Sequence, residues 1–182
     1  MKHSYYYFKG VFSSSEIKNI NAKFLSSKNF NTNPAPFDTK TITVRYHYFN
    51  EVENIVGRAN QFVDYANKHA FGFDMHPLLD METILHNVYD SSVKASYDFH
   101  CDGEDYDKNF TTKLTGLVNL SEDTYEGGHF EIFDGSKIKR IKELEQPGDM
   151  VVFKSDIPHR VTKVTNGTRM SLVILRSGPW WK

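Results

Sequence analysis

The chain has 182 residues, of which 39% are hydrophobic and 25% are charged, and its formal net charge at pH 7 is −1. This length suits one domain with a sizeable core, and the near-neutral charge argues against a nucleic-acid or membrane-surface partner. The single cysteine excludes an internal disulfide, and neither a signal-peptide pattern nor a membrane-spanning apolar run is found. We therefore expect a single cytoplasmic domain, residues 1–182.

The first 80 residues contain two helix patterns, and we expect them to form a helical support region. Ser13 and Glu16 have the spacing of a capping box, and apolar residues at helical spacing follow them. Asn50 and Glu53 repeat this start signal before an apolar stripe that reaches residue 66, and Gly72 is expected to end the helix. Short strands are expected at residues 5–8 and 41–49, with a proline-containing loop at 31–38.

After residue 80 the pattern changes to short β-rich runs separated by turn signals such as Gly127-Gly128 and Asn166-Gly167. Runs of this kind predict a sandwich, barrel or jelly roll, and helices followed by strands indicate an α+β fold with the helices on one outer face. Jelly rolls include cupin-like scaffolds. We expect residues 81–178 to form a jelly-roll catalytic core. Strands are predicted at 83–89, 93–100, 114–120, 129–133, 150–153, 160–164 and 170–175.

The last predicted strand alternates between two kinds of face. Residues two apart on a strand point to the same side, so one face carries Arg169, Ser171 and Val173, and the other is entirely apolar. We expect the apolar face to pack on the helices and the Arg169 face to point into the barrel.

Three residues have the pattern of a metal site. His100 and Asp102 lie two apart in an extended stretch and so share a face, and His159 follows far along the chain. Two imidazoles and one carboxylate form the facial triad of non-heme Fe(II) oxygenases, although catalytic zinc accepts the same ligands. Taken singly, His100 also fits a polar strand end and His159 a turn. Cys101 points to the opposite face and suits packing.

Arg169 suggests a second component of this site. Oxygen activation at Fe(II) needs electrons that a 2-oxo acid can supply, and the far carboxylate of a diacid would need a cation, which a guanidinium matches in bidentate fashion. Ser171 shares its face and offers a hydroxyl. The alternative is that Arg169 caps a surface strand beside the Asn166-Gly167 turn. A hairpin there would separate His159 from Arg169 by roughly 16 Å.

In combination, these motifs resemble the 2-oxoglutarate- and Fe(II)-dependent oxygenases of the prolyl 4-hydroxylase type, especially small bacterial or phage-like PKHD-type members. The resemblance covers most of the chain and is strongest from residue 89 to 175. It rests on Gly10-Val11-Phe12-Ser13, Tyr97-x-x-His100-x-Asp102, Tyr125-Glu126-Gly127-Gly128-x-Phe130, Pro147-Gly148-Asp149 and His159-Arg160-Val161-x-x-Val164-x-x-Gly167-x-Arg169-x-Ser171-Leu172.

The resemblance implies a double-stranded β-helix core in which His100, Asp102 and His159 bind Fe(II) and act in catalysis. It further implies that the distal carboxylate of 2-oxoglutarate pairs with a cation and a hydroxyl, matched here by Arg169 and Ser171. Tyr89 or Tyr97 would touch the same carboxylate, and Tyr89 is preferred because Tyr97 lies closer to the ligands. O2 is the second co-substrate, ascorbate is the implied reductant, and a phage-encoded member would act in the host cytoplasm.

The implied reaction is hydroxylation of a C–H bond, with a prolyl residue in a peptide or protein as the expected substrate. A free amino acid or another small metabolite is an alternative, as is a cupin-like metal-binding module without oxygenase activity or a zinc hydrolase. One departure concerns the strand at 114–120, where some relatives carry a tyrosine near Asn119. We expect Asn119 to be an inward polar residue satisfied by backbone groups. The acidic loop at 102–107 is either a lid or solvated.

Overall fold

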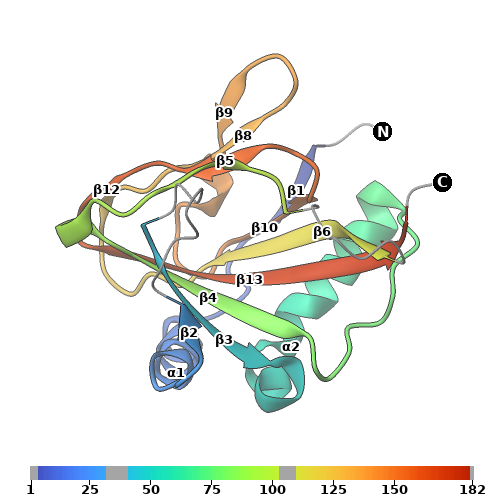
Figure 1. The fold of residues 1–182 in the computed structure, drawn as a ribbon, viewed down its shortest axis with the longest axis horizontal. Helices are drawn as coiled ribbons and strands as arrows, with labels where there is room; N and C mark the ends of the chain where they lie inside the picture. Colours follow the sequence, from blue (N-terminus) through green and yellow to red (C-terminus); the bar gives the residue numbers. More distant parts are fainter. Residues whose placement is uncertain (1–3, 32–40, 103–109, 181–182) are drawn as a thin grey trace.

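The computed structural model describes residues 4–31, 41–102 and 110–180, and it has an α+β fold built on antiparallel sheets (Figure 1). A seven-stranded sheet, a four-stranded sheet and a two-stranded sheet form a core like a double-stranded β-helix. The large sheet runs in the order β1 (Tyr5–Phe8), β10 (Met150–Lys154), β6 (Phe110–Asn119), β13 (Thr168–Pro179), β4 (Thr83–Asp90), β3 (Thr43–Tyr48) and β2 (Phe30–Asn31).

The four-stranded sheet lies across the inner face of the large sheet, and the two helices cover its outer face (Figure 1). Its order is β5 (Tyr97–His100), β11 (His159–Val161), β8 (Phe130–Phe133) and β9 (Ile138–Arg140), while β12 (Val164–Asn166) pairs with β7 (Glu126–Gly127). Short helical turns cover residues Asn67–Phe71, Ser91–Val93 and Lys142–Leu144. No helix within the described ranges is long and apolar enough to cross a membrane.

The alternation predicted for the last strand is confirmed, because the two faces of β13 belong to two different cores. Leu172 and Ile174 pack with the helices, whereas Val173 belongs to the cluster between the sheets. Ser171, two residues before Val173, is fully buried. The inner face of β13 therefore presents polar side chains to the space between the sheets.

Helix α1 (Ser14–Leu25) begins at the predicted capping box. The Ser13 hydroxyl accepts the Glu16 backbone N–H at 3.4 Å, and the Glu16 carboxylate accepts the Ser13 backbone N–H at 2.8 Å. These bonds satisfy two of the four unpaired amides at the start of a helix. The helix then buries Ile17, Ile20 and Phe24 against the large sheet.

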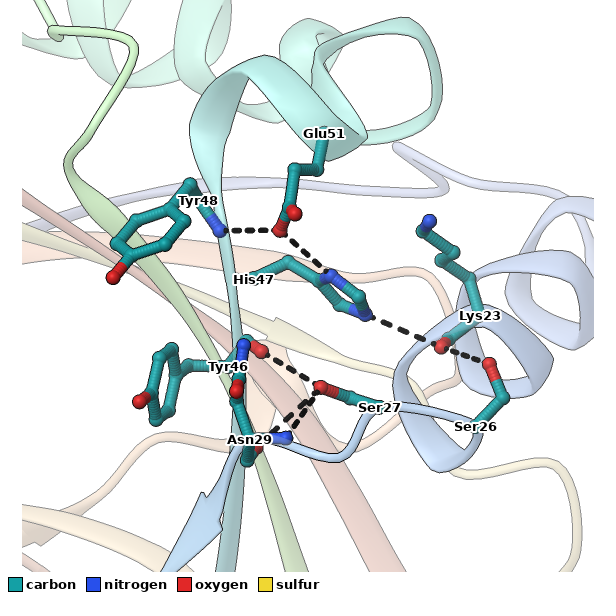
Figure 2. A network of polar contacts seen from close by, with 8 residues as sticks. All are labelled: Lys23, Ser26, Ser27, Asn29, Tyr46, His47, Tyr48 and Glu51. Carbon is teal, nitrogen blue, oxygen red and sulfur yellow. Dashed lines mark hydrogen bonds and ion pairs between the residues drawn. The ribbon is translucent and has the colours of Figure 1, made fainter.

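Helix α2 (Phe49–Ala66) begins one residue before the predicted Asn50, and Glu51 rather than Glu53 accepts the first free amide, the backbone N–H of Tyr48, at 3.0 Å. Figure 2 shows that the same carboxylate oxygen of Glu51 contacts His47 Nδ1 at 3.0 Å, while His47 Nε2 lies 3.4 Å from the Lys23 carbonyl oxygen. This network joins the end of α1 to β3 and α2. The second helix continues to Gly72, whose φ of 71° ends it as predicted.

Two strand predictions are corrected by the structure. The predicted strand at 93–100 starts only at Tyr97, because the Asp90 carboxylate caps a turn at Ser91–Val93 by accepting the Ser92 N–H at 2.7 Å. The predicted strand at 160–164 is divided, so that β11 lies in the small sheet and β12 pairs with β7. The hairpin considered above for His159 and Arg169 does not form, and these residues lie in different sheets.

Candidate metal centre and adjoining cavity

His100, Asp102 and His159 come together at one end of the small sheet. His100 ends β5 and His159 begins β11, and the two are direct partners in the antiparallel register. Asp102 follows two residues after His100. One ligand atom from each side chain lies within 4.8 Å of the others. A single strand pairing thus brings together two histidines that lie about sixty residues apart in the sequence.

The two imidazoles are oriented by the same local device. His100 Nδ1 lies 2.8 Å from the Asp98 carbonyl oxygen, and His159 Nδ1 lies 3.0 Å from the Ile157 carbonyl oxygen. Because a carbonyl oxygen only accepts, each Nδ1 carries the proton and each neutral ring keeps its lone pair on Nε2. These Nε2 atoms face Asp102, at 3.6 Å from Oδ1 for His100 and 3.4 Å from Oδ2 for His159.

This arrangement fits a divalent metal ion of the ferrous type. Two lone pairs and a carboxylate converge from one side, which leaves the opposite side for exchangeable ligands. Nδ1–H bonds to carbonyl oxygens are the usual outer-shell contacts of metal-bound histidines. Zinc accepts the same three ligands, so the donor set by itself selects a class of metal ion and not one metal.

Asp102 is held by residues that the sequence pattern did not single out. The Thr115 hydroxyl donates to Asp102 Oδ2 at 2.7 Å, and it lies 3.0 Å from the Ser155 hydroxyl. The backbone N–H of Asp102 donates to the Ser155 carbonyl oxygen at 2.9 Å. Thr115 precedes Leu117 on the inner face of β6, so strand alternation was the signal that could have identified it.

A cavity of about 150 Å³ lies between the two sheets, and the three metal-site residues form part of its wall. Most of the other lining side chains are apolar, including Leu85, Phe153 and Val173. Tyr97 stacks on His100 with ring centroids 3.5 Å apart, and Phe153 packs its edge against His159 at 4.7 Å. The site is therefore a largely apolar chamber with its polar groups concentrated at particular points.

Arg169 is buried beside this chamber, with its guanidinium next to Ser171 and Tyr89. Only 1% of its surface is exposed, which rules out the alternative of a surface cap. Nη1 donates to the Ser171 hydroxyl at 3.2 Å, and Cζ lies 5.1 Å from the ring centre of Tyr89, its partner on β4. Within the described ranges it forms no ion pair with a carboxylate. A buried charge without a counterion favours an anionic ligand.

The Gly127-Gly128 turn allows this close packing. Gly128 has a φ of 58°, and a Cβ at this position would lie 3.0 Å from Arg169 Cδ. Gly127 has a φ of 75°, and its Cβ would lie 2.1 Å from the Lys163 carbonyl oxygen. Both the backbone conformation and the space therefore require glycine at these two positions.

The two candidate tyrosines occupy different places. Tyr89 is buried next to Arg169, and burial raises the pKa of its hydroxyl, which therefore stays protonated and able to donate. Tyr97 instead covers the His100 ring. Asn119 is confirmed as an inward polar residue satisfied by backbone, because its amide donates to the carbonyls of Leu144 and Glu145 at 3.1 Å. The loop after Asp102 lies outside the described residues.

Residues 85–175 match the family model of the 2OG-Fe(II) oxygenase superfamily. The chain therefore belongs to this superfamily, and His100, Asp102 and His159 form a candidate H-x-D…H iron site. The match covers the strands β4 to β13 that carry all the site residues described above.

Individual relatives with limited sequence identity support the same superfamily. The PKHD-type hydroxylase YbiX of Escherichia coli is 31% identical over 117 residues, which cover 62% of this chain and 50% of that protein. The chain thus spans about half the length of the curated relatives it matches.

Solved structures show the same fold at low sequence identity. A prolyl-4-hydroxylase of Pseudomonas putida superposes with a TM-score of 0.74 at 16% identity, covering 98% of this chain and 95% of that one. The viral collagen prolyl hydroxylase of Paramecium bursaria Chlorella virus-1 gives 0.76 at 15% identity, with 97% of each chain covered.

Proposed function

We propose that this oxygenase hydroxylates a C–H bond of a prolyl residue in a peptide or protein. Fe(II) would be held by His100, Asp102 and His159, with 2-oxoglutarate and O2 as co-substrates and ascorbate as the reductant that keeps the iron ferrous. The observation that carries the proposal is the pairing of a converging metal triad with a buried guanidinium, Arg169, that lacks an acidic partner among the described residues.

The side chains around the chamber would have separate roles in binding the co-substrate and in excluding water. Bound ferrous iron with 2-oxoglutarate and O2 supplies the oxidising chemistry for C–H hydroxylation, with succinate and CO2 as co-products. Arg169 and Ser171 would bind the distal carboxylate of 2-oxoglutarate, because a guanidinium fork matches a carboxylate. Tyr89 would add a hydroxyl donor beside them. The apolar walls would exclude water from the reacting groups.

The prolyl substrate is supported by the named activities of the relatives and by the character of the chamber. Two structural neighbours are described as prolyl hydroxylases, and the sequence relative is named as a PKHD-type hydroxylase. A pyrrolidine ring is small and apolar, and the side chains of Ile42, Val44 and Leu85 give the chamber an apolar lining.

The test is an assay of succinate release by purified protein with Fe(II), 2-oxoglutarate, ascorbate and O2. Candidate prolyl peptides, free amino acids and small metabolites are compared, and mass spectrometry is used to detect the gain of one oxygen atom. We expect a prolyl peptide to gain oxygen in proportion to succinate. Oxygen gain only in a free amino acid or metabolite would overturn the prolyl assignment.

Single substitutions test the site itself. His100→Ala, Asp102→Ala and Arg169→Ala are each expected to reduce turnover at least 100-fold, because each removes a metal ligand or the binding group for 2-oxoglutarate. His69→Ala is the matched control, since this exposed histidine lies in the helical turn after α2 and contacts the Tyr65 ring. Full activity in any of the three site variants would contradict the assignment of that residue.

A further inference from the structure

Two tyrosines on β3 extend the apolar wall of the chamber toward the edge of the large sheet. Residues two apart on a strand point to the same side, so Tyr46 and Tyr48 share the inner face with Val44, which lines the chamber. Tyr46 is also the cross-strand partner of Leu85, another lining residue. The tyrosine rings therefore begin where the lining of the chamber ends.

The opposite face of β3 packs against the helices. Figure 2 shows His47 pointing toward α1 and α2, where it contacts Glu51 and the Lys23 carbonyl oxygen. Both tyrosine rings point to the other side of the strand in the same view. They lie edge to face, with centroids 6.3 Å apart and an interplanar angle of 70°. Each tyrosine is half-buried, so part of each ring is accessible to a ligand.

The hydroxyl groups of Tyr46 and Tyr48 add hydrogen-bond donors to this aromatic surface. Among residues 4–31, 41–102 and 110–180, neither hydroxyl has a hydrogen-bond partner. A surface of this kind suits a ligand that combines apolar rings with exposed carbonyl oxygens. A proline-rich chain in the polyproline II conformation is such a ligand, because it forms no internal hydrogen bonds and proline has no N–H.

The order of strands sets the distance between the tyrosines and the metal site. Thr115, which holds Asp102, lies on β6, and β13 and β4 separate this strand from β3. Neighbouring strands are about 4.8 Å apart, so the tyrosines lie roughly 14 Å across the sheet from Thr115. A polyproline II chain rises about 3.1 Å per residue, so about four or five residues span this distance.

We propose that Tyr46 and Tyr48 form a docking site for a proline-rich segment of the substrate, about four or five residues away from the residue at the metal. The proposal rests on the proposed function, because it takes a prolyl peptide as the substrate. The pyrrolidine rings would pack on the tyrosine rings, and the hydroxyls would donate to carbonyl oxygens of the peptide. Such a chain keeps its conformation on binding, so it loses little conformational entropy.

Binding of decaproline without turnover tests this proposal. Its affinity is measured by calorimetry on Mn(II)-loaded protein with 2-oxoglutarate under anaerobic conditions. We expect Tyr46→Leu and Tyr48→Leu each to weaken binding about five- to tenfold, because each removes a ring contact and a hydroxyl donor. Tyr46→Phe and Tyr48→Phe keep the ring, and each should weaken binding only about two- to fivefold. A glycine–serine peptide of the same length should bind at least about tenfold more weakly than decaproline.

Two controls and a kinetic measurement separate docking from a general change of the site. Tyr65→Leu removes an exposed tyrosine from α2, on the other face of the sheet, and should bind decaproline as the wild type does. The affinity for 2-oxoglutarate should be unchanged in all the tyrosine variants. In turnover, Tyr46→Leu and Tyr48→Leu should raise KM for decaproline without changing kcat. Neither should change KM for triproline, which is too short to reach from the metal to the tyrosines.

The outcomes that would overturn the proposal differ from those that would overturn the proposed function. A wild type that does not bind decaproline, or leucine variants that bind it as the wild type does, would overturn the docking site. An equal loss in Tyr65→Leu, or a parallel loss of 2-oxoglutarate affinity, would overturn it also. Decaproline that binds through Tyr46 and Tyr48, with no prolyl peptide gaining oxygen, would support the docking site and overturn prolyl hydroxylation.

Discussion

At the scale of single residues, both metal-site histidines are oriented through the same short-range contact. Each Nδ1 donates to the carbonyl oxygen two residues earlier, Asp98 for His100 and Ile157 for His159. The contact is local, so each ring is oriented by its own stretch of chain. Asp102 differs, because its carboxylate is held by Thr115 from another strand of the large sheet. The geometry of the centre therefore depends on this hydroxyl.

Thr115→Val is expected to reduce metal affinity about 10-fold, because loss of an outer-shell hydrogen bond typically lowers affinity by one to two orders of magnitude. The measurement is a competitive titration of Mn(II) or Fe(II) against a chelator under anaerobic conditions. Thr165→Val provides the control, since Thr165 is exposed on β12. Equal metal affinity in Thr115→Val and the wild type would remove Thr115 from the support of the site.

At the scale of elements, the contact between α1 and β4 contains a buried histidine. His86 has no exposed surface, stacks on Phe24 at 5.4 Å and donates from Nε2 to Asn21 Oδ1 at 2.8 Å. Burial, with a smaller contribution from the charge of Arg45, lowers the pKa of His86 to about 4. The helix is thus packed on the sheet through a side chain that must remain neutral.

Acid should therefore weaken the folded state through His86. Its pKa is about 4 when folded and about 6.5 when unfolded, so the unfolded chain takes up the proton first. The contribution of neutral His86 to the free energy of unfolding is fully present above pH 6.5. It is lost as the pH falls toward 4, and the free energy of unfolding then decreases by up to about 1.4 kcal/mol per pH unit. Urea unfolding of the wild type and His86→Leu between pH 7.5 and 4.5 measures the difference.

The variant should show a flatter dependence than the wild type in this window only. His69→Leu is the control for the loss of a histidine at an exposed position. Parallel curves for His86→Leu and the wild type would show that His86 does not titrate as its burial implies.

At the scale of the whole molecule, one sheet separates two cores with different tasks. Its outer face packs on α1 and α2, and its inner face lines the chamber. Gly116 on β6 packs tightly against α2, since a Cβ there would lie 2.7 Å from Val63 Cγ2 and 2.9 Å from Met150 Cε. Its neighbours Thr115 and Leu117 point the other way, into the chamber. The helix layer can therefore be perturbed separately from the site.

Gly116→Ala is expected to destabilise the fold by about 1–3 kcal/mol, the usual cost of overpacking a tight core. Urea denaturation measures this loss, and calorimetry of 2-oxoglutarate binding to the folded variant should show little change. Gly57→Ala is the matched control, because its Cβ would meet only Glu53 Cγ at 3.4 Å on α2, and it should stabilise by about 0.5–1 kcal/mol. A Gly116→Ala protein as stable as the wild type would show that α2 can shift to accommodate the added methyl group without loss of stability.

The features that the sequence determined are those with a local cause. The capping box at Ser13 and the two faces of β13 follow from helix and strand geometry over a few residues. The same geometry places His100 and Asp102 on one face. It also places Arg169 and Ser171 together on the face of the last strand that was expected to point inward. The motifs that resemble the 2-oxoglutarate-dependent oxygenases also predicted the superfamily, and the match to the family model confirms this prediction.

Tertiary structure decided what depends on strands far apart in the chain. Only the pairing of β5 with β11 brings His159 to His100, and only the division at 162–163 places Arg169 in the facing sheet rather than in a hairpin. Thr115 and Ser155 acquire their contacts with Asp102 and with each other from segments far apart in the chain. Periodicity fixes the side of a strand to which a residue points, but the choice of partner strand depends on the packing of the whole chain.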